Sequence, residues 1–280
     1  MLKNPPLLCV KNLSISLKNK KKTNLVNNIN FEINENEIFS LIGESGSGKT
    51  ISALSVLGLL PKNIFHVDGE IYFKTQLINK EGKELYKEFR GKQIAISFQN
   101  SLTALNPVFK VGVQISDIIR TNLEVDFKSS REKVLFLFNE VKLDQPKVVY
   151  DMYPHQLSGG MAQRVMLALS LSCSPRLVIA DEPTSSLDKI TQIQILNLIR
   201  KIKEEKKFSL LLITHDLSLV SSISDSIAVM FKGGIVESGD ARKVLTEPNH
   251  SYTKKLITTL KKQNSISKKE KKSREVNIQL

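Results

Sequence analysis

The chain has 280 residues, and 41% of them are hydrophobic, which indicates a globular protein rather than a disordered one. Lys and Arg number 41 against 28 Asp and Glu, so the net charge of +13 leaves nucleic acid and anionic lipid open as partners. The apolar stretches fall far short of the roughly 18 residues that cross a bilayer, so we expect no transmembrane helix. The apolar run near the N-terminus is short and interrupted by Lys11, so it does not resemble a signal peptide. Cys9 and Cys173 have no metal-ligand spacing, so we expect two reduced thiols in a cytosolic protein.

The first hundred residues or so read mainly as strands. Two segments with partial alternation of apolar and polar residues predict an antiparallel pair, and a short apolar run that ends at Gly43 predicts a buried strand. A helical pattern follows over 49–60, where Pro61 ends it. The strands expected in this part are 7–17, 24–33, 37–43, 69–78 and 93–98.

Residues from about 101 to 172 are dominated by helical patterns, after which strands and a helix alternate again. Alternating strands and helices predict a largely parallel sheet with helices on both faces, so the fold class is α/β. The helical stretch reads as an insertion into that sheet. The helices expected are 111–123, 129–143, 161–171 and 190–205, and the later strands are 176–181, 208–215, 224–231 and 233–239.

The segment GESGSGKT at 43–50 matches the phosphate-binding pattern G-x-x-x-x-G-K-[ST], with a strand before it and a helix after it. Glycines let successive backbone N–H groups surround phosphate oxygens. Lys49 would place its charge on the β- and γ-phosphates, and the Thr50 hydroxyl would be a ligand for Mg²⁺. GTPases, nucleoside kinases, helicases and transporter motors all use such a loop. The predicted phosphate-binding residues are Gly43, Glu44, Ser45, Gly46, Ser47, Gly48, Lys49 and Thr50.

Four polar residues follow predicted strands of the same sheet. Asp181 ends the strand RLVIAD, where it suits a Mg²⁺ site, and Glu182 follows it as the candidate general base for an attacking water. Gln99 would reach the metal or the water, and His215 would bond the γ-phosphate and the base. All four lie at carboxyl ends of strands, where open α/β sheets bind their ligands.

A second possible phosphate cradle is LSGGMAQR at 157–164. Ser158, Gly159 and Gly160 stand immediately before a helix predicted from Met161 to about Leu171. A hydroxyl, free N–H groups and the positive end of the helix dipole would together hold an anion. One chain with two such cradles raises the question of which phosphate the second one binds.

Six motifs together resemble the nucleotide-binding subunit of an ABC transporter: GESGSGKT, SFQN, LSGGMAQR, LVIADEP, SSLD and ITHD, in that order. The resemblance covers about 7–262 and implies a P-loop NTPase fold with an antiparallel β subdomain and an inserted helical subdomain of about 101–172. It implies that two cassettes pair head to tail, so that the second cradle serves the partner's ATP and Asp188 crosses the interface. The signature residues are then Leu157, Ser158, Gly159, Gly160 and Met161.

Finer details resemble the importers of peptides and nickel. Asn106-Pro107 after Gln99 and EPNHSYTKKLI near the C-terminus carry this likeness, which implies permease subunits that dock after Gln99, a homologous second ATPase in a heterodimer, and an extracytoplasmic solute-binding protein. The peptide members commonly have a cysteine-rich C-terminal extension that is missing here, which favours the nickel branch. Residues 13–30 contain no aromatic side chain to stack on adenine, so only an apolar contact, from Val26 or from a partner, is expected.

The main alternative is a soluble ABC ATPase that acts on nucleic acid or ribosomes, as the net charge would suggest. Such proteins usually carry two cassettes or a long coiled-coil insertion, and this chain has one cassette and no such insertion. An inactive structural partner is disfavoured because Lys49, Ser158, Asp181, Glu182 and His215 are all present. We therefore expect an ATPase that is peripheral to the cytoplasmic face of the membrane, with a single cassette over 1–262 and a basic, disordered tail over 263–280.

Overall fold

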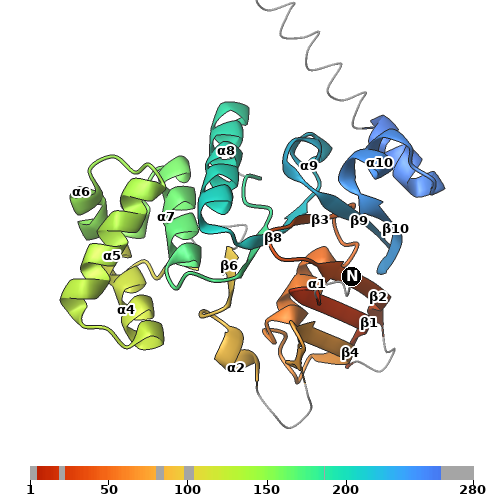
Figure 1. Ribbon diagram of the computed structural model, residues 1–280, viewed down its shortest axis with the longest axis horizontal. Helices are drawn as coiled ribbons and strands as arrows, with labels where there is room; N and C mark the ends of the chain where they lie inside the picture. Colours follow the sequence, from red (N-terminus) through yellow and green to blue (C-terminus); the bar gives the residue numbers. More distant parts are fainter. Residues whose placement is uncertain (1–4, 19–22, 80–84, 98–103, 186, 260–280) are drawn as a thin grey trace, which may run out of the picture.

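The computed structural model describes residues 5–18, 23–79, 85–97, 104–185 and 187–259. These residues form two sheets and a separate group of helices (Figure 1). The four-stranded sheet has the order β2-β1-β4-β5, and the six-stranded sheet has the order β10-β9-β3-β8-β7-β6. The mixture of one antiparallel sheet and one mainly parallel sheet with helices confirms the predicted α/β class.

The four-stranded sheet is antiparallel throughout and contains both strands of the predicted N-terminal pair. Apolar and polar residues alternate in these strands because the apolar side chains face a core that also contains Ala53 and Val56 of the first helix. The predicted strand 69–78 is wrong in its bounds: pairing begins at Phe65, and a turn with Lys74 at φ 55° splits the segment in two. The strands are β1 Leu8–Leu17, β2 Asn24–Ile33, β4 Phe65–Phe73 and β5 Gln76–Leu77.

The six-stranded sheet is parallel except for its last strand, which pairs antiparallel with β9. Three of its four inner strands, β3, β7 and β8, are buried at every residue, which explains their mainly apolar sequences. Their register pairs Ile42 with Thr214 and Asp181 with Ile213, so the three strands end at the same edge of the sheet. The strands are β3 Ile38–Ile42, β6 Ile94–Ser97, β7 Leu177–Asp181, β8 Ser209–Thr214, β9 Ser226–Phe231 and β10 Gly234–Asp240.

The first helix, α1, ends at Val56, four residues before the predicted end at Leu60. Gly58 takes φ 61°, and the ring of Tyr86 occupies the space where its Cβ would lie, so the chain leaves the helix there. The helices α2, α9 and α10 were not predicted, because none of them is longer than 7 residues and so short a segment shows little helical periodicity. The helices outside the helical group are α1 Lys49–Val56, α2 Tyr86–Phe89, α8 Lys189–Lys206, α9 Leu217–Ile223 and α10 Ala241–Thr246, followed by helical residues 251–259.

The helical group lies beside the β6 edge of the large sheet in Figure 1 and contains no strand between residues 104 and 176. One hydrophobic cluster joins it to that sheet, because Phe138 and Val165 share a core with Leu212 of β8. Helix α5 begins at Phe127, two residues before the predicted start, because Asp126 caps it by accepting a hydrogen bond from the Ser129 N–H. Helix α6 was not predicted. The members are α4 Val111–Leu123, α5 Phe127–Glu140, α6 Pro146–Asp151, the 3₁₀ turn η1 Pro154–Gln156 and α7 Gly159–Leu171. In the part of the chain that the structure describes, every helix is too short or too polar to cross a membrane.

Candidate nucleotide-binding site

The glycine-rich segment 43–50 forms the turn between β3 and α1, as its sequence predicts. Gly43 has φ 153°, and a Cβ there would lie 2.2 Å from the carbonyl oxygen of Met230 on β9. Only glycine allows the loop to pass so close to the neighbouring strand. The loop is therefore fixed against the sheet at its first residue and against the start of α1 at its last residues.

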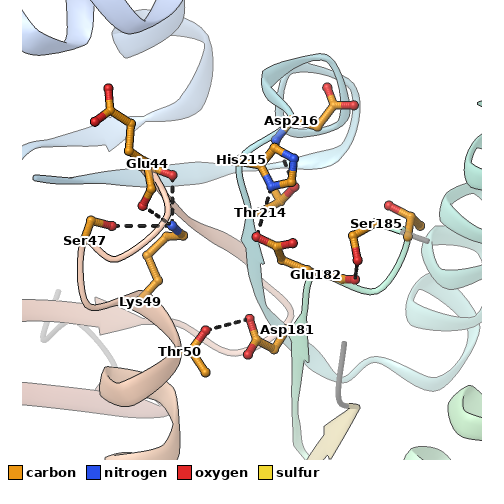
Figure 2. A network of polar contacts seen from close by, with 12 residues as sticks. Glu44, Ser47, Lys49, Thr50, Asp181, Glu182, Ser185, Thr214, His215 and Asp216 are labelled. Carbon is orange, nitrogen blue, oxygen red and sulfur yellow. Dashed lines mark hydrogen bonds and ion pairs between the residues drawn. The ribbon is translucent and has the colours of Figure 1, made fainter. Parts of the chain in front are cut away.

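Lys49 lies at the centre of this loop and is only 5% exposed (Figure 2). Its Nζ donates to the carbonyl oxygens of Gly43 at 2.9 Å and Glu44 at 2.8 Å, and to the Ser47 hydroxyl at 3.4 Å. Burial lowers the pKa of Lys49, and the carboxylates of Glu182 and Asp181 oppose that effect. The loop thus holds a buried cation on acceptors that the oxygens of a phosphate would replace.

Thr50 and Asp181 come together from α1 and β7. The Thr50 hydroxyl donates to Oδ1 of Asp181 at 3.2 Å, and Asp181 is 5% exposed. Burial raises the pKa of Asp181, and the Thr50 hydrogen bond and the Lys49 charge oppose the rise. A hydroxyl beside a carboxylate offers the hard oxygen ligands that Mg²⁺ prefers. The described residues contain no group of three or more His, Cys, Asp or Glu that could hold a metal ion by themselves.

Glu182 and His215 face each other across the ends of β7 and β8 (Figure 2). The Nδ1 atom of His215 lies 3.0 Å from Oε1 of Glu182, and the side chains are 61% and 19% exposed respectively. Glu182 has φ 46°, a left-handed conformation that is uncommon for a residue with a side chain. Its N–H donates to the Ile213 carbonyl at 2.8 Å, so the β8 ladder holds this conformation in place.

The signature segment sits at the start of α7, and the predicted helix start at Met161 is two residues late. Gly159 and Gly160 form the first turn, and Ser158 is the N-cap whose hydroxyl accepts from the Met161 N–H at 3.3 Å. Leu157 is buried, while Ser158 and Gly159 are exposed. The first N–H groups of a helix have no partner within it, so this exposed turn is suited to an anion.

The signature lies beside the start of α8. A Cβ on Gly160 would lie 3.3 Å from the methyl group of Thr191, and one on Gly159 would lie 3.5 Å from Leu187. Asp188 caps α8, because its Oδ1 accepts from the N–H groups of Ile190 and Thr191 at 3.0 Å each. The exposed carboxylate of Asp188 thus shapes the surface next to the signature within the same chain.

Gln99 lies outside the described residues. Val26 is only 1% exposed, and its methyl group lies 3.1 Å from the Cβ position of Gly48, so it is part of the core and offers no face to an adenine ring. Tyr252 was missed as a site residue: its hydroxyl oxygen accepts from the Glu44 N–H at 3.2 Å, and the only sequence signal was the segment EPNHSYTKKLI.

A phosphate loop between a central strand and a helix, with acidic residues at the end of another parallel strand of the same sheet, defines a P-loop NTPase. The chain belongs to the ABC transporter family, whose model matches residues 26–185. Cassettes of this family bind and hydrolyse ATP together with Mg²⁺, so an ATPase is the expected enzyme.

Relatives and a solved structure support the same assignment. The chain is 39% identical over 257 residues to the dipeptide transport ATP-binding protein DppD of Haemophilus influenzae, an alignment that covers 91% of this chain and 77% of that protein. It is 39% identical to the oligopeptide transport ATP-binding protein OppD of the same organism, with 89% and 77% covered. The dimeric structure of MJ0796, a bacterial ABC transporter cassette, superposes with a TM-score of 0.73 at 25% identity, covering 84% of this chain and 99% of that one.

Proposed function

We propose that this chain is the ATP-hydrolysing subunit of an ABC importer for short peptides. The observation that carries the proposal is the meeting of Lys49, Asp181 and the Glu182–His215 pair at one edge of the parallel sheet. The names of these two relatives, which align over most of the chain, favour peptides over nickel.

The residues of the loop bind and orient the triphosphate. Backbone N–H groups of 43–50 surround the β-phosphate, and Lys49 exchanges its carbonyl acceptors for phosphate oxygens. Thr50 and Asp181 would hold Mg²⁺, directly or through water, and Gln99 would be a further ligand. A bound ion would neutralise charge on the phosphates. Glu182 then accepts the proton of the attacking water, and His215 orients its carboxylate through Nδ1.

The second half of the site is the signature segment, which serves the ATP of a partner cassette. Ser158 offers its hydroxyl and Gly159 and Gly160 their N–H groups to the γ-phosphate, with the dipole of α7 behind them. Asp188 lies beside them at the interface. ADP lacks the group that both halves contact, so hydrolysis lets the pair separate. To shift the two cassettes from almost entirely open to almost entirely closed, ATP must favour the closed pair by about 5.5 kcal/mol. A few charge-assisted hydrogen bonds to the γ-phosphate, at roughly 1.5–3 kcal/mol each, are sufficient.

Exposed apolar side chains near the predicted permease contact support a membrane-spanning partner. Val108 and Phe109, just after Asn106-Pro107, are 69% and 54% exposed although both are large and apolar. A membrane-spanning subunit that covers them would remove this apolar surface from water. The chain would then lie at the cytoplasmic face of the membrane, paired with a homologous ATPase, in a complex that receives its solute from an extracytoplasmic binding protein.

The test is reconstitution with candidate permease, companion ATPase and solute-binding proteins from the same organism. We expect ATP-dependent accumulation of a labelled di- or oligopeptide in vesicles, and none with Lys49→Ala. Accumulation of nickel in place of peptide would move the assignment to the nickel branch. Salt-sensitive stimulation of the ATPase by DNA or ribosomes, with no affinity for the permease, would contradict the proposal and favour the soluble alternative.

A further inference from the structure

The C-terminal segment 247–259 is held against the body of the protein by its own hydrogen bonds. The Glu237 carboxylate of β10 accepts from the N–H groups of Asn249 at 2.7 Å and His250 at 3.1 Å. Nδ1 of His250 in turn accepts from the Tyr252 N–H at 3.2 Å. These bonds fix the start of the last helical segment and, with it, the position of the Tyr252 ring.

Tyr252 packs against the strand that supports the phosphate loop. Its ring stacks on Phe231, the last residue of β9, with centroids 4.0 Å apart and planes inclined by 25°, and Tyr252 is only 8% exposed. The preceding residue of β9, Met230, is the one whose carbonyl oxygen lies against Gly43. The ring is therefore placed beside the first turn of the loop.

The hydroxyl of Tyr252 reaches the loop backbone itself. Its oxygen accepts from the Glu44 N–H at 3.2 Å, while the Gly43 carbonyl accepts from Lys49 Nζ at 2.9 Å. The carbonyl of Gly43 and the N–H of Glu44 belong to one planar peptide group. Tyr252 and Lys49 thus hold the two ends of the same peptide plane, and a rotation of that plane breaks both contacts.

We propose that Tyr252 is a positioning residue for ATP binding, through which the C-terminal segment holds the phosphate loop in its binding conformation. The inference rests on the proposed function, because it concerns the affinity of the same loop. Without the hydroxyl, the Gly43–Glu44 peptide group gains freedom that nucleotide binding must remove again. One neutral hydrogen bond at a partly buried position corresponds to a loss of affinity of roughly three- to tenfold.

The test compares Tyr252→Phe with Thr258→Val as a matched control. Phenylalanine keeps the stacking on Phe231 and removes only the acceptor for Glu44. Valine removes a hydroxyl that donates to the Lys254 carbonyl at 2.7 Å in the same helical segment. We expect Tyr252→Phe to raise Kd for Mg·ATP and KM by roughly three- to tenfold, with kcat within about twofold of the parent and Tm little changed. Thr258→Val should leave all four quantities at the parental values.

Two results would overturn the inference. One is a parental Kd in Tyr252→Phe; the other is an equal fall of kcat, affinity and Tm, which would show a purely structural role. Lys49→Ala separates this inference from the proposed function. If Lys49→Ala abolishes ATP binding while Tyr252→Phe binds normally, only the role of Tyr252 fails. If Lys49→Ala binds and hydrolyses ATP like the parent, the nucleotide site itself is misassigned.

Discussion

Glu182→Gln separates the chemistry of the site from its binding. Glutamine is nearly isosteric with glutamate, and its amide oxygen still accepts a hydrogen bond from His215 across the 3.0 Å contact. The substitution therefore keeps the geometry at the ends of β7 and β8 and removes one negative charge and one proton acceptor. Among the described site residues, Asp181 remains to serve the metal.

The size of the effect follows from the role of the lost group. A positioned general base contributes roughly 10²- to 10⁴-fold, or about 3–5 kcal/mol of the barrier, so kcat should fall by that factor. Binding should change in the other direction or remain the same. Burial lowers the pKa of Lys49, and Glu182 is the carboxylate whose charge opposes this most, so it acts directly on the space that the phosphates enter. Its removal lessens repulsion of a triphosphate.

The assay is single-turnover hydrolysis of radiolabelled ATP, together with a measurement of equilibrium ATP binding. Size-exclusion chromatography in the presence of the companion ATPase measures formation of the pair. Glu182→Gln should bind ATP at least as tightly as the parent and accumulate as a closed pair with Mg·ATP. His215→Ala is the companion variant, because it keeps the base and removes its orientation. Hydrolysis by Glu182→Gln within about tenfold of the parental rate would refute the reasoning, because the lower limit for a general base is about a hundredfold.

Three further predictions concern other parts of the molecule. A Cβ on Gly112 would lie 2.2 Å from the ring of Tyr150, so Gly112→Ala should lower the free energy of unfolding by about 1–3 kcal/mol in urea titrations; an unchanged midpoint would contradict this packing. Burial raises the pKa of Cys9 to about 11, so at pH 8 its thiol should react with a disulfide reagent at least about a hundredfold more slowly in the native chain than in urea. The rate in the native chain should increase as the pH rises, and equal rates in the two states would contradict the burial of Cys9. Ser158→Ala and Asp240→Ala each remove an N-cap and should cost about 1 kcal/mol of stability, but only Ser158→Ala should weaken ATP-dependent pairing; equal pairing in both variants would argue against the signature role.

The parts of the fold that the sequence predicts are those in which local chemistry decides the structure. The loop at 43–50 carries its own glycines and lysine, and the inner strands are apolar because both faces are covered. The predicted helix ends were less accurate, because a helix end depends on contacts with other residues. The end of α1 depends on the Tyr86 ring above Gly58, and the start of α7 depends on the Ser158 cap.

The contacts within the site depend on pairing between distant segments. The approach of His215 to Glu182 requires the register that pairs Asp181 with Ile213, and alternation within a single strand carries no information about register. The Tyr252 contact joins residues 208 positions apart, so no local pattern contains it. Residue types at strand ends therefore predicted which groups meet, whereas distances and positioning contacts needed the assembled sheets.

Glu182 and His215 directly follow two inner strands, which has a consequence for local opening of the protein. Amide hydrogens in the middle of a sheet exchange with solvent only when much of the protein unfolds, whereas those at exposed helix ends exchange through small fluctuations. β7 and β8 lie between β3 and β6, while Ser158 and Gly159 stand on an exposed first turn. We therefore expect slow amide exchange in β7 and β8, which carry the half proposed to cleave ATP, and faster exchange at the exposed turn proposed to receive a partner's nucleotide.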